Sequence, residues 1–218
     1  MPQQFDLIVF DWDGTLMDST GVIAGSIQAA CGDLRLDVPS DYAARHVIGL
    51  GLKDAIEQLL PDLSVADYPK LVERYRHHFL SQDADIPLFA GAERLVRDLH
   101  GAGFLLGIAT GKGRPGLDRV LQQTGLREWF HDSRCADECF SKPHPEMLQQ
   151  LMEALGVAPQ RTIMIGDTSH DLQMAQNAGV AGLAVSYGAH LRSDLMQLMP
   201  LACVDSVEEL EQWLLANA

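Results

Sequence analysis

Two carboxylates lie close together just after an apolar segment near the start of the chain. The segment 7–10 is short and partly β-branched, which predicts a buried strand, and Asp11 and Asp13 follow it directly. Side chains two positions apart on an extended backbone share one side, so both carboxylates can reach one point beyond the strand. Because such close like charges repel, a cation or a shared proton is expected between them. The pair favours metal-assisted phosphoryl chemistry, although acids in this position also serve as turn formers or helix N-caps.

Further polar groups that could bind a phosphoryl group occur later in the chain. Thr110 and Gly111 follow the apolar segment 104–109, where a hydroxyl and free backbone N–H groups can face an anion. Lys142 lies in a turn whose path is fixed by two prolines, unlike a lysine on a free helix face. An ordinary turn and a surface lysine are the structural alternatives.

A second pair of acids follows the apolar segment 162–165. Asp167 comes directly after this predicted strand, and Asp171 lies four residues further, one turn into a predicted helix, so both side chains can face the same spot. The alternative is a helix N-cap at Asp167 followed by an acidic first turn, and capping is compatible with metal binding.

These groups form one site only if their strands are parallel. The sequence therefore predicts an α/β fold with a doubly wound parallel sheet, in which the carboxyl ends of all strands lie at one edge. Four clustered carboxylates could not all be ionised without a hard cation with oxygen ligands, and Mg²⁺ is the simplest choice. The predicted metal-binding residues are Asp11, Asp13, Asp167 and Asp171.

Four strings in this order resemble the motifs of the haloacid dehalogenase (HAD) superfamily of aspartate-nucleophile phosphohydrolases. DWDGTL at 11–16 is similar to the first motif, DxDGTL, with Trp where the family more often has Phe or Met. TG at 110–111 is similar to the second motif, KPHP at 142–145 to the third in its phosphoglycolate-phosphatase-like form, and GDTSHD at 166–171 to the fourth. The resemblance covers nearly the whole chain and implies a Rossmann-like core with an inserted C1 helical cap.

The resemblance also implies a mechanism. Asp11 would attack the phosphorus of a phosphate monoester and form an aspartyl-phosphate. Asp13 would protonate the leaving oxygen and then activate water as a base. Mg²⁺ would be held by Asp11, the carbonyl of Asp13 and Asp167, with Asp171 behind. The phosphoryl oxygens would be bound by Thr110, the backbone amides at Gly111 and Lys142. Lys112 and Arg114 could contact the leaving group, but exposure on the surface is the simpler interpretation.

An all-helical insert is predicted between the first two strands. Apolar positions recur at helical spacing from residue 20 to about residue 85, with prolines and glycines between the helices. We predict a core domain of residues 1–16 and 86–218 and a helical cap of residues 17–85. Such an insert is well placed to close over the site and exclude water.

One break in the predicted cap resembles the substrate-specificity loop of such caps. The string VIGLGLK at 47–53 contains Lys53, and Arg45 and His46 precede it. Arg45 and Lys53 are therefore candidate substrate-binding residues, with solvated helix charges as the alternative. The role of His46 stays open.

The composition limits the partners. A formal net charge of -14 would repel nucleic acid and anionic membrane surfaces, so neither is expected to bind. With no signal-peptide pattern and no long apolar window, we expect a soluble, cytoplasmic protein acting on a small phosphorylated metabolite. The oligomeric state, monomer or dimer, is open. Reduced thiols are preferred to a zinc site built from Cys135, Cys139, His131 and His144.

Two other functions share parts of this pattern. A phosphomutase of the β-phosphoglucomutase type would share every core residue and differ in how its cap delays water. A phosphoacceptor signalling module also uses acids, a threonine and a lysine at strand ends, but it is smaller and has no cap. The sequence favours a phosphatase acting on small phosphorylated acids or sugar phosphates, with pyrophosphate or nucleotides also open.

Overall fold

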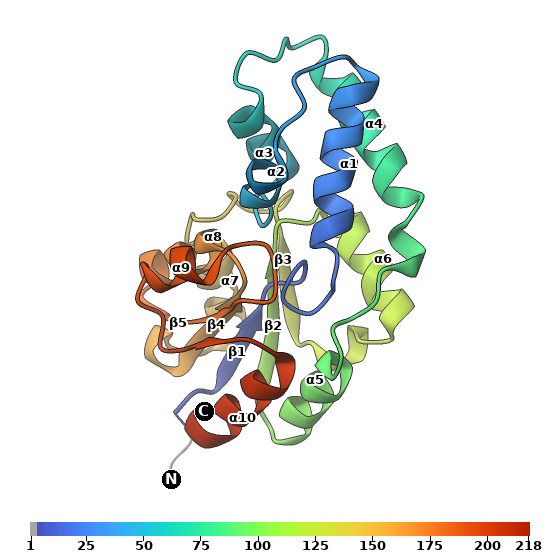
Figure 1. Ribbon diagram of the computed structural model, residues 1–218. Helices are drawn as coiled ribbons and strands as arrows, with labels where there is room; N and C mark the ends of the chain where they lie inside the picture. The colour runs from blue at the N-terminus through green and yellow to red at the C-terminus, as the bar shows by residue number, and fades with distance from the viewer. Residues whose placement is uncertain (1–3) are drawn as a thin grey trace.

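The computed structural model describes residues 4–218 and contains one six-stranded sheet (Figure 1). The order across the sheet is β3-β2-β1-β4-β5-β6, and every neighbouring pair is parallel. This order is that of a doubly wound α/β fold, and it confirms the predicted fold class. The strands are β1 (Leu7–Phe10), β2 (Leu105–Thr110), β3 (Asp132–Cys135), β4 (Thr162–Gly166), β5 (Ala181–Val185) and β6 (Cys203–Val204).

The central strand β1 is buried on both faces because helices cover both sides of the sheet. Ile8 and Phe10 belong to the hydrophobic cluster that includes residues of α5 (Ala92–Gly101), α6 (Arg114–Thr124) and α10 (Val207–Asn217). Leu7 and Val9 point the other way, into a cluster with residues of α7 (Glu146–Leu155) and α8 (Ser169–Ala178). An apolar run of four residues is therefore a buried parallel strand.

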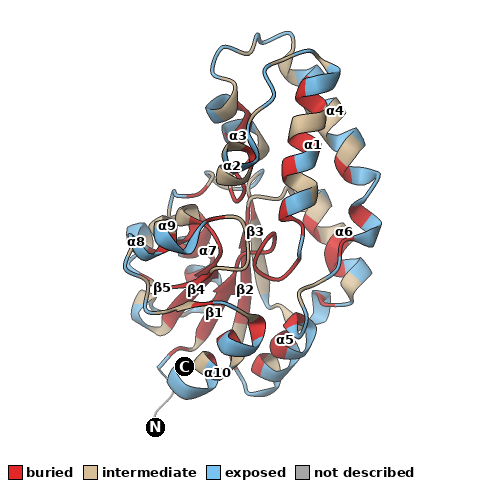
Figure 2. Cartoon of the chain, viewed as in Figure 1, coloured by how far each residue is buried: buried red, intermediate tan, exposed pale blue. Residues whose placement is uncertain are grey.

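Four helices between β1 and β2 form a separate helical group. They are α1 (Thr20–Asp33), α2 (Asp41–His46), α3 (Leu52–Leu59) and α4 (Tyr68–Leu80). Figure 1 shows them together at one end of the molecule. A hydrophobic cluster joins α1, α3 and α4 through Ile27, Ile56 and Leu71, and it includes Val47, the residue after α2. Figure 2 shows buried positions where these helices face one another and exposed positions on their outer sides.

Short elements depart from the sequence-based expectation. The helix expected from residue 144 begins at Glu146, because residues 141–145 form the turn that carries Lys142. The five-residue helix α9 (Arg192–Met196) was not predicted, because so short a segment carries no helical periodicity. Three 3₁₀ turns, at Asp83–Asp85, Arg127–Trp129 and Pro159–Arg161, complete the chain. Within residues 4–218, no helix has the length and apolar character needed to cross a membrane.

Candidate active site

Three buried carboxylates meet at the carboxyl edge of the sheet. Asp11 follows β1, Asp167 follows β4 and Asp171 lies in the first turn of α8. One carboxylate oxygen from each lies within 4.8 Å of the others. The parallel register brings the ends of β1 and β4 together, because Phe10 pairs with Ile165 and the N–H of Asp11 donates to the carbonyl of Ile165 at 2.9 Å. Residues 156 positions apart in the sequence thus share one site.

Lys142 is the cation of this cluster. Its Nζ lies 3.0 Å from Oδ1 of Asp11 and donates a hydrogen bond to Oδ1 of Asp171 at 2.6 Å, with no exposed side-chain surface. Burial alone would lower the pKa of Lys142, but the charges of Asp11 and Asp171 outweigh it and raise the pKa. One lysine against three carboxylates still leaves an excess of negative charge.

Two of the three carboxylates have raised pKa values. Burial raises the pKa of Asp11 well above its usual range, against the opposing charge of Lys142. Burial and then the charge of Asp171 raise the pKa of Asp167 to about 7, although the backbone N–H of Ala189 at 2.7 Å and the hydroxyl of Thr15 at 2.9 Å both donate to this carboxylate. The cluster is therefore short of positive charge.

The donor set fits a hard divalent cation. Oδ1 of Asp11 accepts a hydrogen bond from the backbone N–H of Trp12 at 2.6 Å, but the buried Oδ2 of Asp11 has no hydrogen-bond partner within residues 4–218. A buried carboxylate oxygen without a partner is costly unless something else binds it. Oxygen-only ligands of this kind suit Mg²⁺, and Asp11, Asp167 and Asp171 are the residues that fit it.

Two glycines make room for Asp167. Gly14 has a φ of +82°, and a Cβ there would lie 2.1 Å from Oδ2 of Asp167. A Cβ on Gly188, in the loop after β5, would lie 2.2 Å from the same oxygen. The roles of Gly188 and Ala189 could not be predicted from the sequence, because a small residue and a backbone donor leave no motif.

The N-cap alternative for Asp167 is wrong, because the cap of α8 is Thr168. Its hydroxyl and the carboxylate of Asp171 form a capping box, in which the backbone N–H of Thr168 donates to Oδ2 of Asp171 at 3.1 Å. This carboxylate thus has two functions: Oδ2 caps the helix and Oδ1 binds Lys142.

Asp13 does not join the carboxylate cluster, which corrects the expectation that four carboxylates gather around one point. β1 ends at Phe10, and the chain then turns through residues 12–17, so the geometry of an extended strand no longer applies. Oδ1 of Asp13 instead accepts a hydrogen bond from the Ser19 hydroxyl at 2.6 Å and lies 3.0 Å from Nζ of Lys112. The two acids of the first motif therefore have different surroundings.

A cavity of about 740 Å³ lies between the helical group and the sheet edge. Asp11, Asp13, Thr110 and Gly111 line it from the sheet side, and apolar residues of α1 and α4 line it from the helical side. Thr110 is buried, and its Oγ1 accepts a hydrogen bond from the backbone of Lys112 at 3.2 Å. Gly111 must be a glycine, because a Cβ there would lie 2.5 Å from the carbonyl oxygen of Leu50.

The candidate residues of the helical group differ in position. Lys53 lines the cavity with a 72% exposed side chain, 3.7 Å from Glu57. Arg45 is not brought to the cavity, because its guanidinium donates to Thr20 at 3.0 Å and to Asp41 at 2.9 Å. His46 contacts residues of the sheet side through its backbone carbonyl and its ring.

The carbonyl of His46 connects the helical group to residues near the sheet edge. The Nδ1 of His190 accepts from the backbone of Ser169 at 3.0 Å, so its Nε2 carries the hydrogen donated to this carbonyl at 3.2 Å. The Nε2 of His170 lies 2.9 Å from the same carbonyl oxygen, and the rings of His46 and His190 stack at 4.5 Å.

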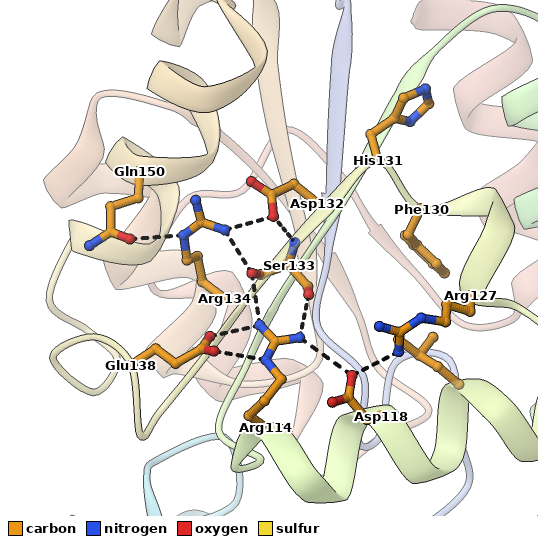
Figure 3. Close-up of a pocket in the computed structure, with 11 residues that line it drawn as sticks. Arg114, Asp118, Arg127, Phe130, His131, Asp132, Ser133, Arg134, Glu138 and Gln150 are labelled. Carbon is orange, nitrogen blue, oxygen red and sulfur yellow. Dashed lines mark hydrogen bonds and ion pairs between the residues drawn. The ribbon is translucent and has the colours of Figure 1, made fainter.

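A second pocket of about 650 Å³ lies beside the edge strand β3, and Figure 3 shows the paired charges around it. Arg114 binds Glu138 at 2.7 Å, and the other ion pairs are Arg127 with Asp118 at 2.8 Å and Arg134 with Asp132 at 2.7 Å. Its cations are thus already neutralised, and none of the predicted catalytic or metal-binding residues lines it.

The zinc alternative has no support in the described chain. The three aspartates form the one group of at least three potential ligands found within residues 4–218. The thiols of all four cysteines are free, and burial raises the pKa of Cys135 to about 12.

Comparison with known proteins identifies the class to which this fold and site belong. Residues 8–185 match the model of the haloacid dehalogenase-like hydrolase family, so the chain belongs to this family and is an enzyme of the hydrolase class. Both the predicted family and the predicted enzyme class are confirmed. Membership also favours an enzyme over a phosphoacceptor signalling module.

Curated relatives match over almost the whole chain. The Dickeya dadantii protein named Probable phosphatase IndB is 35% identical over 209 residues, covering 93% of this chain and 90% of its own. Pyrophosphatase PpaX of Halalkalibacterium halodurans is 31% identical, covering 95% of each chain. Phosphoglycolate phosphatase of Vibrio vulnificus is 29% identical, covering 99% of each.

A solved structure supports the fold. The crystal structure of a hydrolase from Pseudomonas syringae has a TM-score of 0.89, with 20% identity and 99% of each chain covered. At this identity the similarity concerns the fold, and it extends through the helical group as well as the sheet.

Proposed function

We propose that the chain is a Mg²⁺-dependent phosphatase that hydrolyses small phosphate monoesters through an aspartyl-phosphate at Asp11. The supporting observation is the setting of Asp11. Its carboxylate lines the cavity, one oxygen is held by Lys142 and Trp12, and the other is buried without a partner among the described residues. We also propose that residues 1–16 and 86–218 act as the core domain and residues 17–85 as the cap.

The first half-reaction transfers the phosphoryl group to the enzyme. An oxygen of Asp11 attacks phosphorus, the bond from phosphorus to the ester oxygen breaks, and Asp13 donates its proton to that oxygen, which leaves as an alcohol. Asp13 lines the same cavity and is only 7% exposed, so it can meet the ester oxygen away from bulk water.

The second half-reaction restores the enzyme. Asp13, now ionised, takes a proton from water, the resulting hydroxide attacks phosphorus, and the bond to Asp11 breaks to release inorganic phosphate. Thr110, the amide at Gly111 and Lys142 would bind the phosphoryl oxygens throughout. When bound by Asp11, Asp167 and the carbonyl of Asp13, with Asp171 behind, Mg²⁺ supplies the charge that offsets the repulsion between the nucleophile and the phosphate.

The cavity of about 740 Å³ is large enough for a small phosphorylated metabolite. The relatives carry the names phosphatase, phosphoglycolate phosphatase and pyrophosphatase, and we propose small phosphorylated metabolites of these kinds as substrates. The negative net charge argues against nucleic-acid or membrane partners, and a cytoplasmic location stays a prediction from the sequence.

A rate panel tests the proposal. Purified chain is given phosphoglycolate, pyrophosphate, hexose phosphates and p-nitrophenyl phosphate with Mg²⁺ or with EDTA, and released phosphate is measured. We expect Mg²⁺-dependent phosphate release from at least one ester and none in EDTA. Isomerisation of a hexose phosphate without phosphate release would instead identify a mutase, and undiminished rates in EDTA would refute the metal assignment.

A further inference from the structure

Lys112 occupies an unusual position for a lysine in a loop. It follows β2, and its side chain is only 9% exposed, so the sequence-based expectation of a solvated surface residue is wrong. Its Nζ lies 3.0 Å from Oδ1 of Asp13 and 4.9 Å from the centre of the Phe79 ring of α4. Lysine is rarely buried without a functional or ionic partner.

Other cations that line the cavity are placed differently. Arg119 donates to Asp83 at 2.5 Å, and Lys53 is 72% exposed beside Glu57. Arg76 lines the cavity from α4 and is exposed to solvent. Among the described cavity-lining residues, Lys112 is the one cation that combines a largely covered side chain with contact to the proposed general acid.

The geometry fixes what Lys112 can reach. A proton passes from Asp13 to the ester oxygen only when that oxygen lies within hydrogen-bond distance of the carboxyl group. Because Nζ is 3.0 Å from the same carboxyl group, it then lies within about 6 Å of the ester oxygen, close enough to reach a group one or two bonds beyond that oxygen. An ammonium has three donors, so the contact with Asp13 leaves capacity for another acceptor.

We propose that Lys112 is a specificity-determining residue that binds a negative group on the leaving group of the substrate. It would select phosphate monoesters or anhydrides whose leaving group carries a carboxylate or a second phosphate next to the ester oxygen. The Phe79 ring, 4.9 Å from Nζ, strengthens this preference, because an apolar neighbour lowers the local polarity around the ammonium. The proposal rests on the proposed phosphatase function.

The neighbouring cation does not compete for this role. Arg114 points to the edge of the sheet, where its guanidinium binds Glu138 and Ser133 in the pocket of Figure 3. Two basic residues that are close in the sequence thus serve different sites.

Two esters of similar size test the proposal. 2-Phosphoglycolate has a carboxylate two bonds from the ester oxygen, and 2-hydroxyethyl phosphate has a neutral hydroxymethyl group there. kcat and KM are measured for both esters with the wild type, Lys112→Met, Lys112→Arg and the control Lys70→Met. Lys70 is an exposed lysine of α4 that pairs with Asp67.

We expect the wild type to prefer the anionic ester, and Lys112→Met to lower the ratio of the two kcat/KM values roughly 10- to 100-fold, as for loss of a charge-assisted hydrogen bond. The loss should lie mainly in KM for 2-phosphoglycolate, because this contact exists before the reaction begins. Lys112→Arg should restore most of the ratio, and Lys70→Met should match the wild type.

Each other outcome overturns the proposal. An equal loss for both esters, through kcat, would assign Lys112 to holding Asp13 in place. A wild-type ratio of one or less would exclude selection by charge, and this measurement needs no variant. If Lys112→Met does not unfold cooperatively on heating, Lys112→Gln is measured in its place, and the ratio of the two kcat/KM values is expected to fall by the same factor. A wild type that hydrolyses neither these esters nor p-nitrophenyl phosphate would refute the phosphatase function itself, and the proposal with it.

Discussion

The three buried carboxylates should destabilise the metal-free protein, and Asp167→Asn should relieve part of that cost. Folding raises the pKa of Asp167 from 3.8 to about 7. A carboxyl group with a raised pKa holds its proton more tightly when folded, so its contribution to stability is fullest below pH 3.8 and is lost as the pH rises through about 7. At about 1.4 kcal/mol per pH unit, this interval corresponds to about 4 kcal/mol.

Asparagine removes the charge but changes two hydrogen bonds. Its single carbonyl oxygen can accept from the N–H of Ala189, and the hydroxyl of Thr15 can reverse to accept from the amide. Allowing about 1–3 kcal/mol for imperfect geometry, we expect Asp167→Asn to be about 1–3 kcal/mol more stable than the wild type at pH 8 without metal. At pH 4 the advantage should disappear, because the wild-type carboxyl group is then protonated in the folded state.

Urea unfolding of both proteins in EDTA at pH 4, 6 and 8 measures this difference. Comparing the two proteins at each pH cancels the contributions of groups that do not interact with the Asp167 carboxylate, such as His190, whose pKa burial lowers to about 4. Excess Mg²⁺ at pH 8 should stabilise the wild type by about 2–3 kcal/mol at a hundredfold excess over its Kd, and the variant much less. A variant that is less stable than the wild type at pH 8 in EDTA, or a difference independent of pH, would refute this reasoning.

Three further perturbations address single residues. Asp11→Asn should fold normally yet lose turnover by roughly 10⁴-fold or more, as expected for a lost nucleophile; steady-state rates near those of the wild type would remove Asp11 from this role. Asp13→Ala should slow hydrolysis of an ester with a poor leaving group more than hydrolysis of p-nitrophenyl phosphate, because p-nitrophenolate leaves with little protonation. An equal loss of rate for both esters in the first half-reaction would argue against a general acid at this position. Gly188→Ala should lower activity and Mg²⁺ affinity because its Cβ would displace Asp167, whereas Gly25→Ala, in open space on α1, should change neither. Calorimetric titration with Mg²⁺ measures the affinity of each variant. Equal affinities would show that the loop at Gly188 moves aside without displacing Asp167.

The sequence was sufficient for the parts of the site that depend on strand order. Asp11 and Asp167 follow apolar segments, and parallel pairing of β1 with β4 brings them together as expected. Lys142 was recognisable because two prolines, Pro143 and Pro145, follow it closely. The positions of these residues depend on strand order and on a proline-containing turn, and apolar segments and prolines are visible in the sequence.

Features that depend on side-chain direction could not be predicted. Asp13 lies two positions from Asp11, but the turn after β1 directs it to Lys112, on a loop about 100 residues away. The contributions of Gly188 and Ala189 depend on the space and the backbone donor they provide at Asp167. Arg45 has the right chemistry for a phosphate, but neighbouring acceptors in the helical group bind it.

Chemical trapping of the phosphorylated enzyme tests the role of Asp11 most directly. Asp13→Ala is mixed with p-nitrophenyl phosphate and Mg²⁺, quenched in acid and reduced with borohydride, which converts an acyl-phosphate into an alcohol. Mass spectrometry of the digested chain should find homoserine at position 11 only in the sample that received substrate. An unmodified position 11 during demonstrated turnover, or the label at another residue, would contradict the account.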